Sequence, residues 1–337
     1  KNKKPNMQYV RNVVSQIKKY VKKNQIIILE CTSYPGTTEE FFLPIFKKKK
    51  LNIGRDIFLG YSPEREDPGN LKYTILKKNL SKVVSGYSKS CEKIVKELYQ
   101  KVSNKVYICS DIKTAEFTKL LENIYRSVNI GLINELHNVC KKMKIDTFEA
   151  LKAAKTKPFG FNAFYPGPGV GGHCIPVDPY YLTYKAKKHG IITKFIKLAS
   201  QINDKRPVEI SNTITKYIKK ENIKKGILIL GITYKKNSDD VRESPITKIH
   251  QILSKQIKNK IYVCDPLVNK YGLKTLKNIK FISLKKLYNL KFLDSLEICF
   301  IGSNHDIFDY QAIAKNFKII FDSRNSFKRK SKKIKII

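Results

Sequence analysis

The chain has 337 residues, of which 42% are hydrophobic, and a formal net charge of +39 at pH 7. That length predicts two or three domains, and the hydrophobic fraction excludes a disordered chain. The longest apolar runs are of the type Ile26–Leu29 and Ile227–Leu230, far too short for a membrane-spanning helix. The first residue is Lys1 rather than Met, and Lys1–Tyr9 lacks the apolar core of a signal peptide. We therefore expect a soluble, cytoplasmic protein whose N-terminus is cut.

The distribution of charge and the spacing of the cysteines narrow the possible classes of protein further. The basic residues are spread along the whole chain, with the densest runs at Lys47–Lys50 and Lys328–Lys333, which is typical of a lysine-rich solvated surface. A nucleic-acid-binding protein is the alternative, and steeply salt-dependent DNA binding would indicate it. The seven cysteines stand singly, without a CxxC pair, which argues against a structural zinc site and a disulfide framework.

The first third of the chain alternates short β-rich runs with amphipathic stretches. Ser88–Lys101 is predicted to be a helix capped by Ser88 or Ser90. Such alternation favours a parallel sheet with helices on both faces. Strands are predicted at Gln25–Glu30, Asp56–Tyr61, Lys82–Gly86 and Val106–Cys109.

In the middle of the chain the period changes to that of a helix. Apolar residues recur every three or four positions from Phe117 to Met143 without a proline, which predicts one long helix over Thr114–Lys144. A long helix in the middle of a chain usually joins domains or packs against the same helix of a second copy in a dimer. Asp146 is predicted to cap a further helix that ends near Lys155.

A loop rich in glycine, proline and aromatic residues, Lys157–Asp178, precedes a second α/β region. Helices are predicted at Pro179–His189, which Gly190 ends, and near Ile196–Lys220. Strands separated by helical segments are predicted at Ile227–Thr233, Ile261–Asp265, Glu297–Gly302 and Ile319–Asp322.

The residues Gly167–Gly172 contain a literal GxGxxG. A dinucleotide-binding fingerprint must follow a strand and open a helix, whereas here the next helix starts only after Pro179. We therefore expect a ligand-binding loop, with a plain glycine-rich connection as the alternative. No other GxGxxG occurs in the sequence, so a cofactor-binding half-domain would lie upstream of Lys1.

Cys174 follows these glycines directly and precedes a helix, a setting in which a reactive thiol is expected and a packing role is the alternative. Its neighbour His173 suggests a Cys–His hydrolase, but adjacent residues rarely present their side chains to each other. On the long helix, Lys119 and Asn123 stand four residues apart and share a face. Together they could hold an oxyanion, or they could simply form a solvated face.

Five separated segments carry further motifs, at Glu30–Glu40, Tyr61–Asn70, Ala115–Leu136, Phe159–Leu182 and Leu230–Pro245. In this order they resemble the UDP-glucose/GDP-mannose dehydrogenase family over nearly the whole chain. The form of Phe164–Gly169 ahead of Gly-Gly-His-Cys looks most like the UDP-N-acetylglucosamine 6-dehydrogenase branch.

The resemblance implies an α/β fold of two Rossmann-like parallel-sheet units joined by a long central helix, the first unit being incomplete. It predicts three domains: the C-terminal part of an NAD-binding domain at 1–110, a central helical dimerisation domain with the cysteine loop at 111–205, and a UDP-sugar-binding domain at 206–337. The resemblance also implies a role in polysaccharide biosynthesis and a homodimer without nucleic-acid or membrane partners.

The reaction that the resemblance implies is an NAD-dependent two-step oxidation of the C6 alcohol of UDP-N-acetylglucosamine to a carboxylate, through a thioester on Cys174. Lys119 and Asn123 would stabilise oxyanions at C6. The remaining catalytic candidates are Asp178 beside Lys119, Glu64 in thioester hydrolysis, and Thr32 as the holder of a water. Substrate contacts are expected at Tyr165, Gly167, Gly169, Gly171 and Lys235, cofactor contacts at Thr32, Ser33 and Arg242, and no metal.

Two features depart from the family pattern. The N-terminal glycine fingerprint is absent, and no arginine occurs between Arg126 and Arg206 to reach a partner's substrate site. UDP-glucose and UDP-N-acetylmannosamine stay open as substrates. A UDP-sugar-binding remnant without a cofactor site and without activity is the alternative from another class.

Overall fold

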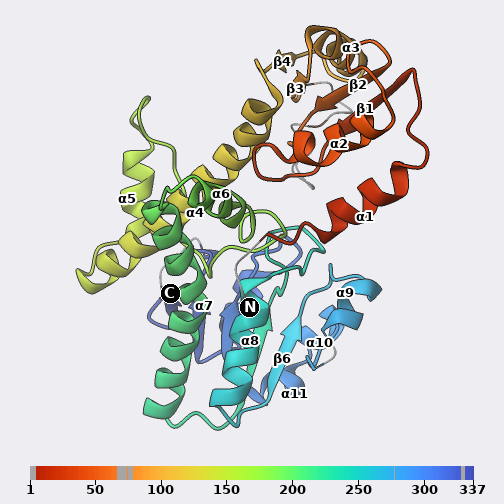
Figure 1. Ribbon diagram of the computed structural model, residues 1–337. Coiled ribbons are helices and arrows are strands. Elements are labelled where there is room, and N and C mark those ends of the chain that lie inside the picture. Colours follow the sequence, from red (N-terminus) through yellow and green to blue (C-terminus); the bar gives the residue numbers. More distant parts are fainter. Residues whose placement is uncertain (1–4, 67–73, 75–78, 277, 328–330) are drawn as a thin grey trace. The chain divides into compact units, whose positions relative to one another are not determined.

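The computed structural model describes residues 5–66, 74, 79–276, 278–327 and 331–337 (Figure 1). The chain forms two compact units, one from Lys1–Tyr125 and Val177–Ile196, the other from Arg126–Pro176 and Lys197–Ile337. We call them unit 1 and unit 2. The part of the second family-like motif at Asp67–Asn70 lies outside the described residues.

Unit 1 contains a sheet in the order β1-β2-β3-β4. Its strands are β1 (Gln25–Leu29), β2 (Ile57–Tyr61), β3 (Lys82–Gly86) and β4 (Val106–Ile108), so the four predicted strands are confirmed. The helices of this region are α1 (Gln8–Ile17), α2 (Thr37–Lys48) and α3 (Lys89–Gln100). Ser88 caps α3 as predicted, because its hydroxyl accepts from the backbone N–H of Cys91 at 3.3 Å.

Helices cover both faces of this sheet, as the α/β pattern predicts. Successive residues of β3 point to opposite faces, with Val83 in a core that includes Phe42 and Phe46 of α2 and Val84 in a core that includes Val95 of α3. The expectation of a wholly parallel sheet is wrong at one pair, since β2 and β3 are antiparallel. Antiparallel neighbours need no crossover helix between them, so the alternation of elements does not report their direction.

The long helix is confirmed as α4 (Ile112–Lys142), and it contributes to both units. It is followed by α5 (Thr147–Ala154), whose cap is Asp146 as predicted. The Asp146 carboxylate accepts from the backbone N–H groups of Phe148 at 3.0 Å and Glu149 at 3.2 Å. The predicted helices further on are α6 (Asp178–Lys188) and α7 (Lys194–Lys220). Past the end of α6, Gly190 takes the left-handed conformation with φ of 76°.

Unit 2 contains a parallel sheet in the order β6-β5-β7-β8-β9. Its strands are β5 (Gly226–Leu230), β6 (Ile261–Cys264), β7 (Leu296–Ile301), β8 (Ile319–Asp322) and β9 (Ile334–Ile336), the last of which was not predicted. The helices of this region are α8 (Pro245–Gln256), α9 (Lys270–Thr275), α10 (Leu284–Leu287), α11 (Leu290–Leu293) and α12 (Tyr310–Lys315).

The central strand β5 is buried on both faces, which explains its unbroken apolar sequence. Ile227 and Ile229 pack in a core with α7 and α8, which run along one face of the sheet in Figure 1. Leu228 and Leu230 belong to the core on the opposite face. None of the helices in the described part of the chain has both the length and the apolarity needed to cross a membrane.

Candidate active site

Two predicted catalytic residues of unit 1 are in direct contact. The side-chain amide of Asn123 on α4 donates to the Asp178 carboxylate at 2.5 Å, and both residues are buried. Burial raises the pKa of Asp178 to about 6, while the Asn123 hydrogen bond and the charge of Lys119 act in the opposite direction. Asp178 is therefore a carboxyl group that can exchange a proton near neutral pH, with Lys119 close enough to influence it.

The predicted residues Thr32 and Ser33 lie in the loop that follows β1, with two residues between the end of the strand and Thr32. The hydroxyl of Ser33 is fully buried and has no hydrogen-bond partner among the described residues. The backbone carbonyl of Thr32 accepts from the thiol of Cys31 at 3.5 Å. Burial raises the pKa of Cys31, and the charge of Asp178 adds to the effect, which ties this segment electrostatically to the Asn123–Asp178 pair.

Glu64 has a partner that the sequence analysis missed. Lys82 on β3 has a side chain only 2% exposed, and its ammonium group lies 3.3 Å from the Glu64 carboxylate and 3.9 Å from that of Glu30. Burial acts to raise the pKa of Glu64, but the backbone N–H of Glu66 and the Lys82 charge outweigh it and hold that pKa below its usual range. Glu64 is therefore ionised at neutral pH.

Glu116 is a second residue that the sequence analysis missed. Its fully buried carboxylate accepts hydrogen bonds from the N–H of Gly36 at 2.5 Å and from both the N–H and the hydroxyl of Thr38 at 2.8 Å. Burial raises the pKa of Glu116 to about 7 in spite of these bonds. A signal was present in the sequence, because Glu116 shares the buried face of α4 with Leu120 and Ile124.

These contacts decide how far unit 1 fits the NAD that the resemblance implies. The unpaired hydroxyl of Ser33, at the carboxyl end of a parallel strand, offers a hydrogen bond to a ligand. The N-terminus of α2 would suit a phosphate, but Glu116 already takes the N–H groups of Gly36 and Thr38 there. The described residues of unit 1 thus fit a contact with the cofactor, and they show no cradle for its diphosphate.

In unit 2, the predicted substrate loop is anchored to two helices. The N–H of Gly167 donates to the side-chain carbonyl of Asn134 on α4 at 2.9 Å. The carbonyl of Gly167 accepts from Nε of Arg206 on α7 at 3.1 Å. Asn134 and Arg206 are both buried, so the start of the loop is held by side chains that belong to the protein core.

Two predicted glycines of this loop have a steric reason to be glycine. Gly169 takes a left-handed φ of 125°. A Cβ on Gly171 would lie 2.4 Å from Cβ of Tyr234, which is too close for any side chain. Tyr165 is 53% exposed, and its ring stacks on that of Phe148 in α5 with 6.4 Å between centroids.

Cys174 is exposed, unlike Cys91, Cys109, Cys264 and Cys299, which are buried as expected of packing residues. Arg242 lies close enough for the two charges to interact. The guanidinium of Arg242 is held by the Asp240 carboxylate at 2.7 Å, and this hydrogen bond, followed by the effect of Cys174 among others, raises the pKa of Arg242. The structure therefore places Arg242 with Asp240 and Cys174, and its assignment to the cofactor stays a prediction.

The segment that follows β5 in unit 2 contacts the glycine loop that contains Cys174. The carbonyl of Arg242 accepts from the N–H of Gly172 at 3.0 Å, so this segment packs on the glycine loop. Lys235 lies in the same segment and is half-buried. The hydroxyl of Thr233 donates to the Lys235 carbonyl at 3.2 Å, which fixes the backbone at this lysine.

Arg324 is a third residue near the predicted site residues that was not predicted from the sequence. Its Nε donates to the carbonyl of Gly302 at 2.9 Å, and Nη2 donates to the carbonyl of Tyr234 at 3.2 Å. Nη1 lies 3.0 Å from the position that a Cβ on Gly167 would take. Burial lowers the pKa of Arg324 to about 10 against the effect of Asp322. Its place just after β8 is a signal, because ligands bind at the carboxyl ends of parallel strands.

The chain matches three domains of the UDP-glucose/GDP-mannose dehydrogenase family: the NAD binding domain over residues 1–103, the central domain over 113–205 and the UDP binding domain over 228–329. It is 36% identical over 332 residues to Protein CapL of Staphylococcus aureus, an alignment that covers 96% of this chain and 76% of CapL. The chain belongs to the UDP-glucose/GDP-mannose dehydrogenase family. The match to the NAD binding domain starts at residue 1, and it does not support the prediction that this domain lacks its start.

The chain has similar sequence identity to relatives whose names give different substrates. Identity is 38% over 248 residues to a UDP-N-acetyl-D-mannosamine dehydrogenase of Methanocaldococcus jannaschii, covering 73% of this chain and 54% of the relative. It is 37% over 273 residues to a UDP-N-acetyl-D-glucosamine 6-dehydrogenase of Pseudomonas aeruginosa, covering 80% and 64%. The chain thus spans about half to two thirds of the length of these two curated relatives.

The fold agrees with that of a solved family member. The structure of a UDP-D-ManNAc dehydrogenase from Pyrococcus horikoshii superimposes with a TM-score of 0.85 at 27% identity, covering 99% of this chain and 77% of that one. The α/β architecture with parallel sheets and a long central helix is therefore confirmed as the family's own.

Proposed function

We propose that the chain is an NAD-dependent 6-dehydrogenase of a UDP-linked N-acetylhexosamine, with UDP-N-acetylglucosamine as its substrate. The form of Phe164–Gly169 supports the acetylglucosamine branch. UDP-N-acetylmannosamine differs from it only in configuration at C2, and the Methanocaldococcus jannaschii relative makes it the alternative. When NAD⁺ is bound, it accepts the hydride that C6 loses in each of the two oxidation steps.

The observation that carries this proposal is the exposed thiol of Cys174, set in the glycine loop and close enough to Arg242 for their charges to interact. A cation near a thiol favours the thiolate, which is the nucleophilic form. The thiolate adds to the C6 aldehyde and forms a C–S bond. This bond keeps C6 in the site until the second oxidation gives a thioester.

The polar residues of unit 1 stabilise the oxyanions and hydrolyse the thioester, and the protonation state of each residue determines its role. Lys119 and Asn123 stabilise negative charge on the C6 oxygen, as a cation and an amide donor can. Asp178, with a pKa of about 6, is the better proton acceptor for the water that attacks the thioester, and C–S cleavage then frees Cys174. Glu64 is ionised, and Lys82 holds it in place to orient that water, as Thr32 does.

The proposal also includes the substrate contacts, a homodimer and a cytoplasmic location. Tyr165, Gly169 and Gly171 shape the substrate loop, and Lys235 contacts the UDP-sugar by charge-assisted hydrogen bonding. Exposed apolar residues along α4 support a homodimer through that helix. All seven cysteines are free thiols, which fits a reducing compartment such as the cytoplasm.

Calorimetric titration tests the substrate, and it does not require turnover. UDP-N-acetylglucosamine, UDP-N-acetylmannosamine and UDP-glucose are titrated into the chain separately. Tightest binding of UDP-N-acetylglucosamine supports the proposal, whereas preference for the manno sugar selects the alternative. Failure of all three sugars to bind would contradict a UDP-sugar site in this chain.

Mass spectrometry tests the thiol chemistry. The chain is mixed with NAD⁺ and the UDP-sugar that binds best, and the mixture is quenched in acid and digested. The expected product is a thioester between C6 of the sugar and the thiol of Cys174, found on the peptide that contains Cys174. Cys174→Ser should abolish the adduct and lower acid formation by at least about a hundredfold. Cys140→Ser, at a half-buried cysteine of α4, is the matched control and should leave both unchanged. Acid formed at the normal rate by Cys174→Ser would refute the mechanism.

A further inference from the structure

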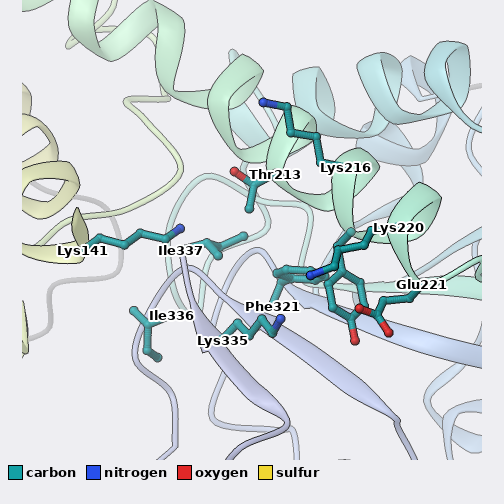
Figure 2. Close-up of a pocket in the computed structure, with 10 residues that line it drawn as sticks. Lys141, Thr213, Lys216, Lys220, Glu221, Phe321, Lys335, Ile336 and Ile337 are labelled. Atoms are coloured by element: carbon teal, nitrogen blue, oxygen red, sulfur yellow. The ribbon is translucent and has the colours of Figure 1, made fainter. Parts of the chain in front are cut away.

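A pocket of about 430 Å³ opens on unit 2 beside α7 (Figure 2). Its walls come from the second half of α7, the end of α4, and the C-terminal residues of β8 and β9. It contains none of the residues that have a role in the proposed reaction. Its volume falls in the range of small-molecule sites rather than of macromolecular interfaces.

The apolar part of this pocket packs against the core of unit 2. The ring of Tyr217 meets that of Phe321 edge to face, with centroids 5.5 Å apart and planes at 82°. Phe321 is part of the buried core, and Ile337 beside it is also buried. These two residues support the half-buried side chains of Tyr217 and Ile336, which offer an apolar surface to the organic part of a ligand.

Positive charge surrounds that surface. Four lysines and one glutamate line the pocket, Lys141, Lys216, Lys220, Lys335 and Glu221. This ratio exceeds that of the whole chain, which has 67 basic and 28 acidic residues. Among the residues that the structure describes, none of these four lysines is in a salt bridge with a carboxylate. Lys335 instead places its ammonium group 4.2 Å from the centroid of the Tyr217 ring.

The lysines also repel one another. Figure 2 shows Lys141 extending from α4 toward Ile337. Although much of its surface is accessible, partial burial lowers the pKa of Lys141, and the charges of Arg206, Lys335 and Lys142 lower it further. The nearby acid Glu297 is paired with Lys318 at 3.1 Å and does not offset this charge. A bound anion would neutralise the excess.

We propose that this pocket is a second ligand site, which binds a phosphorylated small molecule. The phosphate lies among Lys141, Lys335 and the lysines of α7, and the organic part rests on the half-buried side chains of Tyr217 and Ile336. A phosphate suits the site because several ammonium groups, acting as point charges, can share its oxygens. The site is independent of the UDP-sugar loop and of the reaction proposed at Cys174.

Calorimetric titration with inorganic pyrophosphate at physiological ionic strength tests the site. The wild-type chain should bind it saturably. The double variant Lys141→Gln/Lys335→Gln should weaken binding by at least about tenfold, since it removes two of the ammonium groups that contact the phosphate. Lys235→Gln, which removes a lysine from the proposed substrate site, should retain this pyrophosphate binding.

The matched control is Lys255→Gln/Lys258→Gln, which removes the same charge from exposed positions at the end of α8. Its pyrophosphate affinity should stay within about twofold of wild type. Equal weakening by both double variants would mean diffuse attraction to a basic protein and would overturn the proposal, as would the absence of saturable binding. Circular dichroism checks that the pocket variant is folded, and if it is not, the single variants Lys141→Gln and Lys335→Gln replace it.

Discussion

At the scale of single residues, Glu116 links the start of α2 to α4. Its carboxylate bonds to Gly36 and Thr38, which stand 80 and 78 residues earlier in the chain. These bonds fix the backbone directly after the segment of Thr32 and Ser33. An acid with no solvent exposure holds this segment, so the stability of unit 1 should depend on its protonation.

The raised pKa of Glu116 gives the sign of that dependence. The folded chain keeps a proton on Glu116 up to about pH 7, whereas the unfolded chain loses it near the usual value of 4.5. The free energy of unfolding should therefore fall as pH rises between these values, by up to roughly 3 kcal/mol.

Glu116→Gln should reduce this fall, because glutamine does not titrate. It should also lower stability at pH 5, because the amide NH2 cannot accept a hydrogen bond from a neighbouring donor, as the hydroxyl oxygen of the protonated acid still can. Urea unfolding at pH 5 and 7.5 measures both effects. Glu135→Gln, at an exposed position of the same helix, is the control and should behave as wild type. An undiminished fall in Glu116→Gln would contradict the assignment of the pH dependence to Glu116.

Candidate site residues that belong to a local motif could be proposed from the sequence, and those defined by distant contacts could not. Asn123 and Asp178 were reached through their motifs, and the hydrogen bond between them agrees with a shared site. Arg324 meets the carbonyl of Tyr234, a residue 90 positions away. Lys82 lies in a strand where a lysine normally indicates an exposed face, and only the fold shows that it is buried against Glu64.

At the scale of elements, α4 was the most predictable part of the chain because its apolar period extends over many turns. Strand β9 was missed because it has only three residues, in a lysine-rich stretch. The antiparallel β2–β3 pair was missed because strand direction depends on the path of the chain between strands.

The exposed side of α4 should form the proposed dimer contact. Leu132 is 51% exposed, Leu136 44% and Val139 47%, at the spacing of one helical face. Leu132→Glu/Leu136→Glu should dissociate the dimer, since it would bury carboxylates without partners. Analytical ultracentrifugation measures the mass, and Lys142→Gln, which removes one positive charge from the same helix, should leave the dimer intact. A wild-type chain that sediments as a monomer would contradict the contact.

At the scale of the whole molecule, the net charge of +39 should destabilise the fold through self-repulsion. Raising the ionic strength from about 20 mM to about 300 mM with sodium chloride shortens the Debye length severalfold and should raise the melting temperature by several degrees. Differential scanning calorimetry measures the change. A melting temperature that falls with salt would show that attractive ion pairs outweigh the repulsion.

The order in which the chain is made has a consequence for unit 1. Its second stretch, Val177–Ile196, is synthesised only after residues 126–176 of unit 2. The proposed nucleophile Cys174 therefore leaves the ribosome before the proposed proton acceptor Asp178, and unit 1 cannot be completed until α6 has emerged. A transcript that stops between these two residues would yield a polypeptide that retains the thiol of Cys174 and lacks the carboxyl group of Asp178. Two gene fragments divided there could restore unit 1 only by assembling with each other.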